Sequence, residues 1–268
     1  MKFIKRKSPW ENEWADLLKK EAKYAEKRQV GPTSILINKL DRFVPDKLSD
    51  TLNGAFYKGF EVIFEKGTGV IEKTYNREQK EKEFQVNAYA AELGADRKTV
   101  RKFTKRAKST KAANLMASTV EGVGLGLVGA GLPDIPLFIG MILKSVYEIA
   151  LSYGYRYDTE AEKVFILRLI QVAMMDGEDF LQANSELNEL IEHVAADGDS
   201  MEGYQVDKTA QMKATSEALS SEMLYTKFLQ GTMIVGVAGG IFNPVYMNRI
   251  TDYAVLKYRR RFLQSKML

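Results

Sequence analysis

The sequence contains no cysteine and a single histidine among its 268 residues. The absence of cysteine excludes disulfide bonds and every metal or redox site that depends on thiolates, and it fits a reducing cytosol. With one histidine, a Ser-His-Asp triad would have to recruit His193, and no serine lies in a recognisable nucleophile motif. The sequence therefore gives no support to sulfur chemistry or to a triad hydrolase.

Several signatures of phosphate binding, targeting and nucleic-acid binding are also absent. The chain has neither a GxxxxGK[ST] phosphate loop nor a GxSxG motif. Its first ten residues are basic, but they lack the long apolar stretch and cleavage site of a secretory signal. The net charge is only +4, so overall steering toward nucleic acid is weak, and no recognised nucleic-acid module is present. We expect no nucleic-acid partner.

The hydrophobic and charged fractions, 45% and 28%, are ordinary for a globular protein, and strand signals are scarce. We predict an all-α fold, a single globular, bundle-like domain of about eight to ten helices with two glycine-rich central helices. An N-terminal helical arm (residues 1–38) would precede the main helical domain (39–268). Helices are expected over residues 9–28, 77–93, 158–175, 179–196 and 244–266, with further helical segments in 47–75 (interrupted by glycines), from 96 onward, and from 206 to 240.

Two glycine-rich apolar stretches are the most distinctive feature. Each contains a pair of glycines four residues apart, Gly122 with Gly126 and Gly236 with Gly240, so each pair lies on one helical face. Faces without Cβ atoms allow close backbone approach, and we predict that the two pack against each other or against another close helix in the core, or border an apolar ligand. Further candidates for this packing or ligand role are Gly124, Gly129, Asp134, Pro136 and Asn243.

The first glycine stretch leads into a capped helix. Asp134 is placed to accept a backbone N–H at the start of that helix, and Pro136 lies in its first turn, where a missing N–H costs nothing. The order of these features continues through Asp134-Ile135-Pro136, Tyr147-Glu148, Ala150, Tyr153-Gly154-Tyr155, Asn243, Ala254 and Arg259-Arg260-Arg261-Phe262.

This order and spacing, over roughly residues 39–263, resembles the EcsC family. The resemblance implies a shared fold and a membrane-side context, because the founding member of that family accompanies an ABC transporter in bacteria. It supplies no established catalytic motif.

Gly124, Gly126 and Gly129 also match the spacing of the dinucleotide-binding fingerprint. That motif requires a preceding strand and a helix that opens on the glycines. Here a basic helical segment precedes them and the glycines lie inside an apolar run, so helix packing is the better interpretation. We predict no cofactor.

Metal binding was considered at two places. His193 would share a helical face with Glu189 and Asp197, but a solvated or ion-paired histidine is the commoner arrangement. The acidic segment 197–202 contains a fragment of a calcium loop without the rest of its ligands, which favours a solvated acidic edge. We predict no metal site.

Basic residues are concentrated between positions 97 and 111. At helical spacing they form two adjacent columns, which would be a solvated face or a surface for anionic lipid or nucleic acid. Lipid is favoured because the stripe runs directly into the apolar glycine-rich segment. The predicted lipid- or anion-contacting residues are Arg97, Lys98, Arg101, Lys102, Lys105, Arg106 and Lys108, with Lys111 completing the stripe.

Two segments, 123–143 and 228–247, approach the length of a membrane span. Asp134 and two prolines interrupt the first, and Gln230, Asn243 and Pro244 interrupt the second, so buried central helices explain them better.

Our first hypothesis for function is therefore a non-catalytic protein, cytoplasmic and peripheral to the membrane, that binds anionic lipid or an apolar ligand. One alternative is a regulatory or interaction protein of an ABC-type membrane transporter, as the resemblance implies. Another is an enzyme acting on a lipid-like substrate; its candidate acids and bases would be Glu121, Asp134, Asp176 and His193. Nothing in the spacing of these residues selects a reaction.

Overall fold

The computed structural model describes residues 7–29, 46–94, 96–120, 134–196, 207–229 and 244–267, without the side chains of 113–120, 134 and 226–229. Within these ranges the regular structure is entirely helical, which confirms the all-α prediction. The elements are α1 (Pro9–Gln29), α3 (Asp46–Val62), the π-helical turn η1 (Ile63–Gly67), α4 (Thr68–Glu72), α5 (Arg77–Leu93), α6 (Arg97–Val120), α7 (Asp134–Ser152), α8 (Glu160–Ala173), α9 (Gly177–Ala196), α10 (Lys208–Leu229) and α11 (Pro244–Ser265).

The helices begin at side chains that satisfy free backbone N–H groups. At α1, the N–H of Glu11 donates to Ser8 Oγ at 3.1 Å and the N–H of Ser8 donates to Glu11 Oε2 at 2.6 Å, a reciprocal capping box. Asn76, Asp96 and Thr159 each accept a backbone N–H from the first turn of α5, α6 and α8. These local signals are why the observed helix bounds lie close to those predicted.

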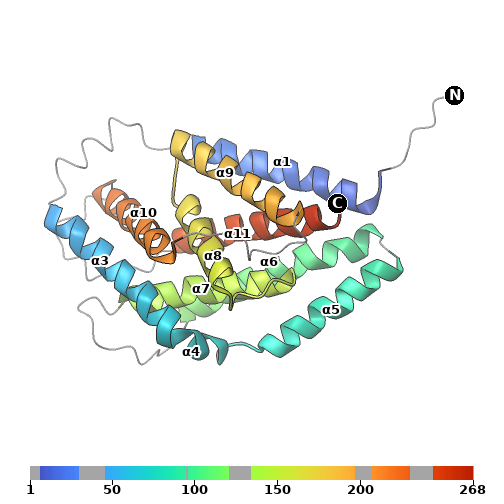
Figure 1. Cartoon of the computed structure of the whole chain (residues 1–268), viewed down its shortest axis with the longest axis horizontal. Coiled ribbons are helices and arrows are strands. Elements are labelled where there is room, and N and C mark those ends of the chain that lie inside the picture. The colour runs from blue at the N-terminus through green and yellow to red at the C-terminus, as the bar shows by residue number, and fades with distance from the viewer. Residues whose placement is uncertain are drawn as a thin grey trace.

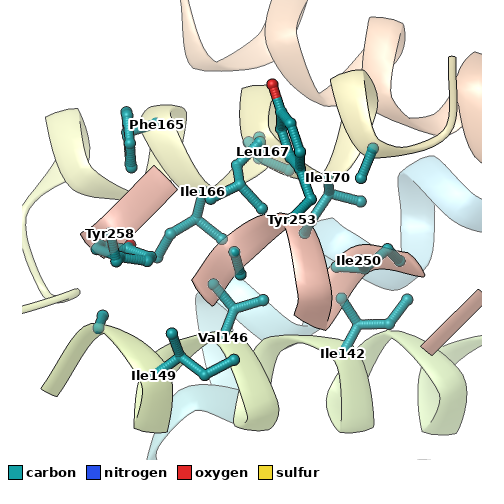
Figure 2. Close-up of a cluster of buried hydrophobic side chains, with 14 of the residues drawn as sticks. Ile142, Val146, Ile149, Phe165, Ile166, Leu167, Ile170, Ile250, Tyr253 and Tyr258 are labelled. Atoms are coloured by element: carbon teal, nitrogen blue, oxygen red, sulfur yellow. The ribbon is translucent and has the colours of Figure 1, made fainter. Parts of the chain in front are cut away.

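The centre of the molecule is formed by α7, α8 and α11. Figure 2 shows Ile142, Val146 and Ile149 of α7 facing Ile250 of α11 and Ile166 of α8. All five side chains are fully buried. Because α7 is apolar around most of its circumference, it packs against α3, α5, α6 and α11 at once.

Helix α11 is unusual because it is buried and strongly charged at the same time. It contacts α1, α6, α7, α8 and α9. Each of its buried basic side chains pairs with a carboxylate from another part of the chain, which offsets the cost of removing the charges from water. These residues are Arg249, Lys257, Arg259, Arg260 and Arg261.

The antiparallel pair α5–α6 forms one side of the molecule, and its turn lies at the end where α1 begins and the chain ends (Figure 1). Helix α6 packs against α7 and also against α1. The turn after α7 fixes α5 in place, because Gly154 adopts a φ of +87° and lies directly against the ring of Phe84.

The predicted glycine docking lies outside the described residues and stays a prediction, and so does the proposed boundary after residue 38. The positions concerned are Gly122, Gly124, Gly126, Gly129, Gly236, Gly240 and Asn243. Asp134 is the first residue of α7, and Pro136 lies buried in its first turn, as the sequence predicts.

Among the described helices, α7 contains a segment long and apolar enough to cross a membrane, Ile135–Ser152, with a mean hydropathy of 1.5. In the fold 83% of this segment is buried, as in the core helix of a soluble protein, which meets the same criterion. Residues 123–133 of the first candidate span and 230–243 of the second lie outside the described residues.

Candidate functional site, a cationic groove between α1 and α6

The basic stripe predicted from the sequence lies on α6, and the structure divides it according to ion-pair partners. Arg106 pairs with Glu83 of α5, and Lys111 pairs with Asp252 of α11 at 2.6 Å. Two further residues, Arg97 and Arg101, reach Glu13 of α1. Within the described part of the chain, the remaining four have no ion-pair partner, and all are exposed: Lys98, Lys102, Lys105 and Lys108.

Glu13 of α1 fixes the position of the stripe. Its carboxylate is almost fully buried, at 3% exposure, and its Oε1 lies 2.8 Å from Arg101 Nε and 3.8 Å from Arg97 Nε. Its other oxygen, Oε2, accepts from Arg259 Nη2 of α11 at 2.7 Å. One carboxylate therefore joins α1, α6 and α11, and holds α6 with its lysines directed outward.

Between α1 and α6 the surface forms an open groove with a volume of about 700 Å³. Seven basic residues, two acidic residues and one threonine line it. They are Glu13, Asp16, Lys20, Arg97, Lys98, Arg101, Lys102, Thr104, Lys105 and Lys108.

Both acids of the groove are already committed to partners. Asp16 pairs with Lys20 and lies 2.9 Å from Arg259 Nη2. Although partial burial opposes it, the hydrogen bonds from Lys20 and Arg259 hold the pKa of Asp16 below its usual value, so this group is ionised at neutral pH. The two carboxylates are thus outnumbered by their own cationic partners, Lys20, Arg97, Arg101 and Arg259. The four unpaired lysines of α6 add to this excess of positive charge in the groove.

The chemistry that this arrangement supports is anion binding without a fixed geometry. A lysine presents a compact charge on a flexible stem, so a row of lysines attracts phosphate or carboxylate groups in many orientations. The guanidinium of Arg101 is about half exposed (52%) and has N–H donors beyond the Nε that Glu13 occupies.

Comparison with known protein families identifies the family of this chain. A model of the EcsC protein family matches residues 11–263, which is nearly the whole chain. The chain belongs to the EcsC family.

Among relatives of this EcsC protein is the uncharacterized protein YdbA of Bacillus subtilis (strain 168). The two are 28% identical over 162 residues, which is 56% of this chain and 54% of YdbA. The match thus spans about half the length of that relative. No solved structure matches the chain.

The other candidate residues do not come together in the described part of this EcsC protein. His193 and Glu189 are both exposed on α9, and Asp197 lies outside the described residues. Asp176 is occupied by ion pairs with Arg28 at 3.2 Å and Arg249 at 2.9 Å. Among the described residues, no cluster of three His, Cys, Asp or Glu side chains could hold a metal ion.

Two of the acids considered for catalysis cannot be placed in a site. Glu121 and the side chain of Asp134 lie outside the part of the chain that the structure describes. The structure also adds residues that sequence reasoning missed. Sequence reasoning missed Glu13 and Asp16 because the partners that place them in the groove are far away in the sequence; Arg101 is 88 residues from Glu13, and Arg259 of α11 contacts both acids. The available signal was the three-residue spacing of Glu13 and Asp16, which places both acids on one side of α1.

Proposed function

We propose that this EcsC-family protein binds anionic membrane surfaces through the cationic groove between α1 and α6. The observation that carries the proposal is a set of four exposed lysines on α6 that have no ion-pair partner in the described structure: Lys98, Lys102, Lys105 and Lys108. Basic residues that are already paired contribute little to binding a new anion. Unpaired ones gain about 1 kcal/mol each near an anionic leaflet.

A lipid surface suits this groove better than one tightly held small anion. The groove is open and its unpaired charges are on flexible lysine stems along three turns of α6. A surface of many anionic head groups can engage all of these lysines at once, whereas one small anion contacts only a few. The protein would act at the cytoplasmic face of the membrane, without catalysis of its own.

The two alternatives, a transporter partner and an enzyme acting on a lipid-like substrate, gain no support from contacts within the described ranges. The first follows from the family context alone. For the second, Asp176 is committed to two arginines and His193 stands exposed on α9 without a neighbouring acid cluster in the described residues.

The structure determines which residues should be changed to test the proposal. Arg101 is unsuitable, because its loss would remove the 2.8 Å hydrogen bond to Oε1 of the buried Glu13 and could disturb the fold. We therefore choose the triple variant Lys102→Glu, Lys105→Glu, Lys108→Glu. Reversing three charges should weaken co-sedimentation with vesicles of phosphatidylcholine and phosphatidylglycerol by more than about 100-fold, with unchanged helical circular dichroism.

A control variant with the same change of net charge is Lys27→Glu, Lys47→Glu, Lys213→Glu. These lysines are exposed on α1, α3 and α10, outside the groove. The control should retain most of the vesicle binding. An equal loss in both triple variants would mean that net charge alone matters, and the groove would have no specific role.

A further inference from the structure

The outer side of α5 exposes large apolar side chains. Val86, Tyr89 and Leu93 are 68%, 63% and 72% exposed. Apart from Val245, every other exposed large hydrophobic residue of the described structure is less than half exposed. Their spacing of three and four residues places the three on one face of α5, opposite the face that buries Ala91. We call these three residues the α5 apolar strip.

The strip lies beside unpaired lysines of the neighbouring helix. On α6, Lys98, Lys102 and Arg106 follow one another at intervals of four residues and form one column. Arg106 pairs across the helix contact with Glu83 of α5. The lysine column is therefore on the side of α6 that borders α5.

Glu83 lies on the side of α5 that faces α6, because it pairs with Arg106. Val86 follows it by three residues and Leu93 by ten, spacings that keep all three on the same side of the helix. Helices α5 and α6 are antiparallel (Figure 1), and the Glu83–Arg106 pair joins them. The α5 apolar strip and the two lysines of the column, Lys98 and Lys102, are all exposed, so both sets face away from the core. The outer face of the α5–α6 pair thus has one apolar half and one cationic half.

We propose that this outer face is a membrane-insertion surface, in which the α5 apolar strip enters the interfacial layer while Lys98 and Lys102 contact anionic head groups. The proposal rests on the proposed function and extends it, because the groove alone would bind by charge only. The occupant is a lipid surface because it offers anionic groups and an apolar layer side by side, matching the two halves of the face. An interfacial site of this kind also accounts for exposed apolar side chains that no described element covers.

Insertion predicts a contribution to binding that salt does not screen. Charge contacts weaken as ionic strength rises, whereas the transfer of apolar surface out of water does not. The double variant Val86→Ser, Leu93→Ser should lower vesicle affinity by about tenfold or more, mainly in the fraction that persists at high salt. Both side chains are exposed, so the fold should be unaffected.

The absence of cysteine allows a direct measurement of depth. Leu93→Cys provides a single thiol for an environment-sensitive nitrobenzoxadiazole dye, and Val245→Cys provides a control at an apolar residue of similar exposure, 64%. Val245 is the second residue of α11, whose other end lies near the turn of the α5–α6 pair (Figure 1). With anionic vesicles, the dye at position 93 should show a severalfold rise and a blue shift of its emission. The dye at position 245 should not.

The outcomes separate the two proposals. Protein that sediments with anionic vesicles while the dye at position 93 keeps its aqueous spectrum would overturn insertion and leave the charge-based proposal intact. Equal affinity of the serine variant and the wild type at high salt would also overturn insertion. Protein that fails to bind anionic vesicles at low salt would overturn the proposed function, and insertion with it.

Discussion

At the scale of single residues, Glu13 is the side chain on which the candidate site depends. It is buried and holds Arg259, which is itself 2% exposed, together with Arg101 of the groove. Glu13→Gln removes the charge but keeps the shape, and Arg259 then keeps its ion pair with Asp16 and its hydrogen bond to the backbone carbonyl of residue 13. Breaking a buried pair from one side costs about 3–5 kcal/mol, so we expect a loss in the free energy of unfolding near the lower end of that range.

Urea denaturation followed by circular dichroism measures this loss. The matched control is Glu78→Gln, which removes a carboxylate whose partner, Lys82, is exposed on α5. Exposed ion pairs of this kind contribute little, so the control should unfold at the wild-type midpoint. Similar midpoints for the Glu13 and Glu78 variants would show that Glu13 does not join the three helices.

A second prediction at this scale concerns the pH dependence of Lys257. Its Nζ lies 3.0 Å from Glu21 Oε1 and 2.6 Å from Asn188 Oδ1. Burial lowers the pKa of Lys257 to about 8, against the opposing effect of Glu21, while the unfolded chain keeps a value near 10.5. Between these values the unfolded state binds more protons than the folded state. This lysine therefore contributes stability above pH 10.5 that is lost as the pH falls toward 8.

Lys257→Met removes this titration, and Glu21 keeps its pair with Arg260 at 2.6 Å. The free energy of unfolding of the wild type, relative to the variant, should rise by on the order of 3 kcal/mol between pH 8 and 10.5. Chemical denaturation of both proteins across that range measures the difference. Stability curves that stay parallel would contradict the lowered pKa.

At the scale of elements, the turn after α7 tests how α5 is positioned. Gly154 has a φ of +87°, and a Cβ built there would lie 2.3 Å from Phe84 Cζ of α5. Gly154→Ala should therefore combine backbone strain with a ring clash, lowering the free energy of unfolding by about 2 kcal/mol or more.

Two other glycines separate these effects. Gly177 has a φ of +64° with no atom within 4 Å of the added Cβ, so Gly177→Ala should show the backbone cost alone. Gly94 has an extended φ of −176° and open space, so Gly94→Ala should be close to neutral. If Gly154→Ala is no worse than Gly177→Ala in thermal melts, Phe84 does not restrain the turn.

The helix bounds could be predicted from the sequence, whereas the pairing of charges between helices could not. The helix bounds predicted from hydrophobic spacing and from glycine and proline positions agree with the structure within a few residues, as at α5 (Arg77–Leu93) and α11 (Pro244–Ser265). The pairing of charges could not be predicted, because the partners of α6 come from α1, α5 and α11. The basic run at Arg259–Arg261 shows the same limit. A run of arginines is normally exposed, and its burial here depends on acids of α1 and α8 that the fold brings to it.

At the scale of the whole molecule, the predicted stripe of eight basic residues divides into two sets. Four are lysines without an ion-pair partner among the described residues, and four form ion pairs with other helices. The unpaired lysines border a groove on one side and the α5 apolar strip on the other. No periodicity in the sequence shows that these two helices share an outer face, because that depends on how α5 and α6 pack on α7. Under the proposed function, this is the side of the molecule that would contact an anionic bilayer.

Co-sedimentation of the wild-type protein with vesicles across a salt series tests this central claim most directly. We expect binding to vesicles that contain phosphatidylglycerol, none to pure phosphatidylcholine, and a decline as ionic strength rises past about 0.1 M, where screening reaches ~10 Å. The α5 apolar strip should leave a residual fraction at high salt. Wild-type protein that stays in the supernatant with anionic vesicles at low salt would contradict the account.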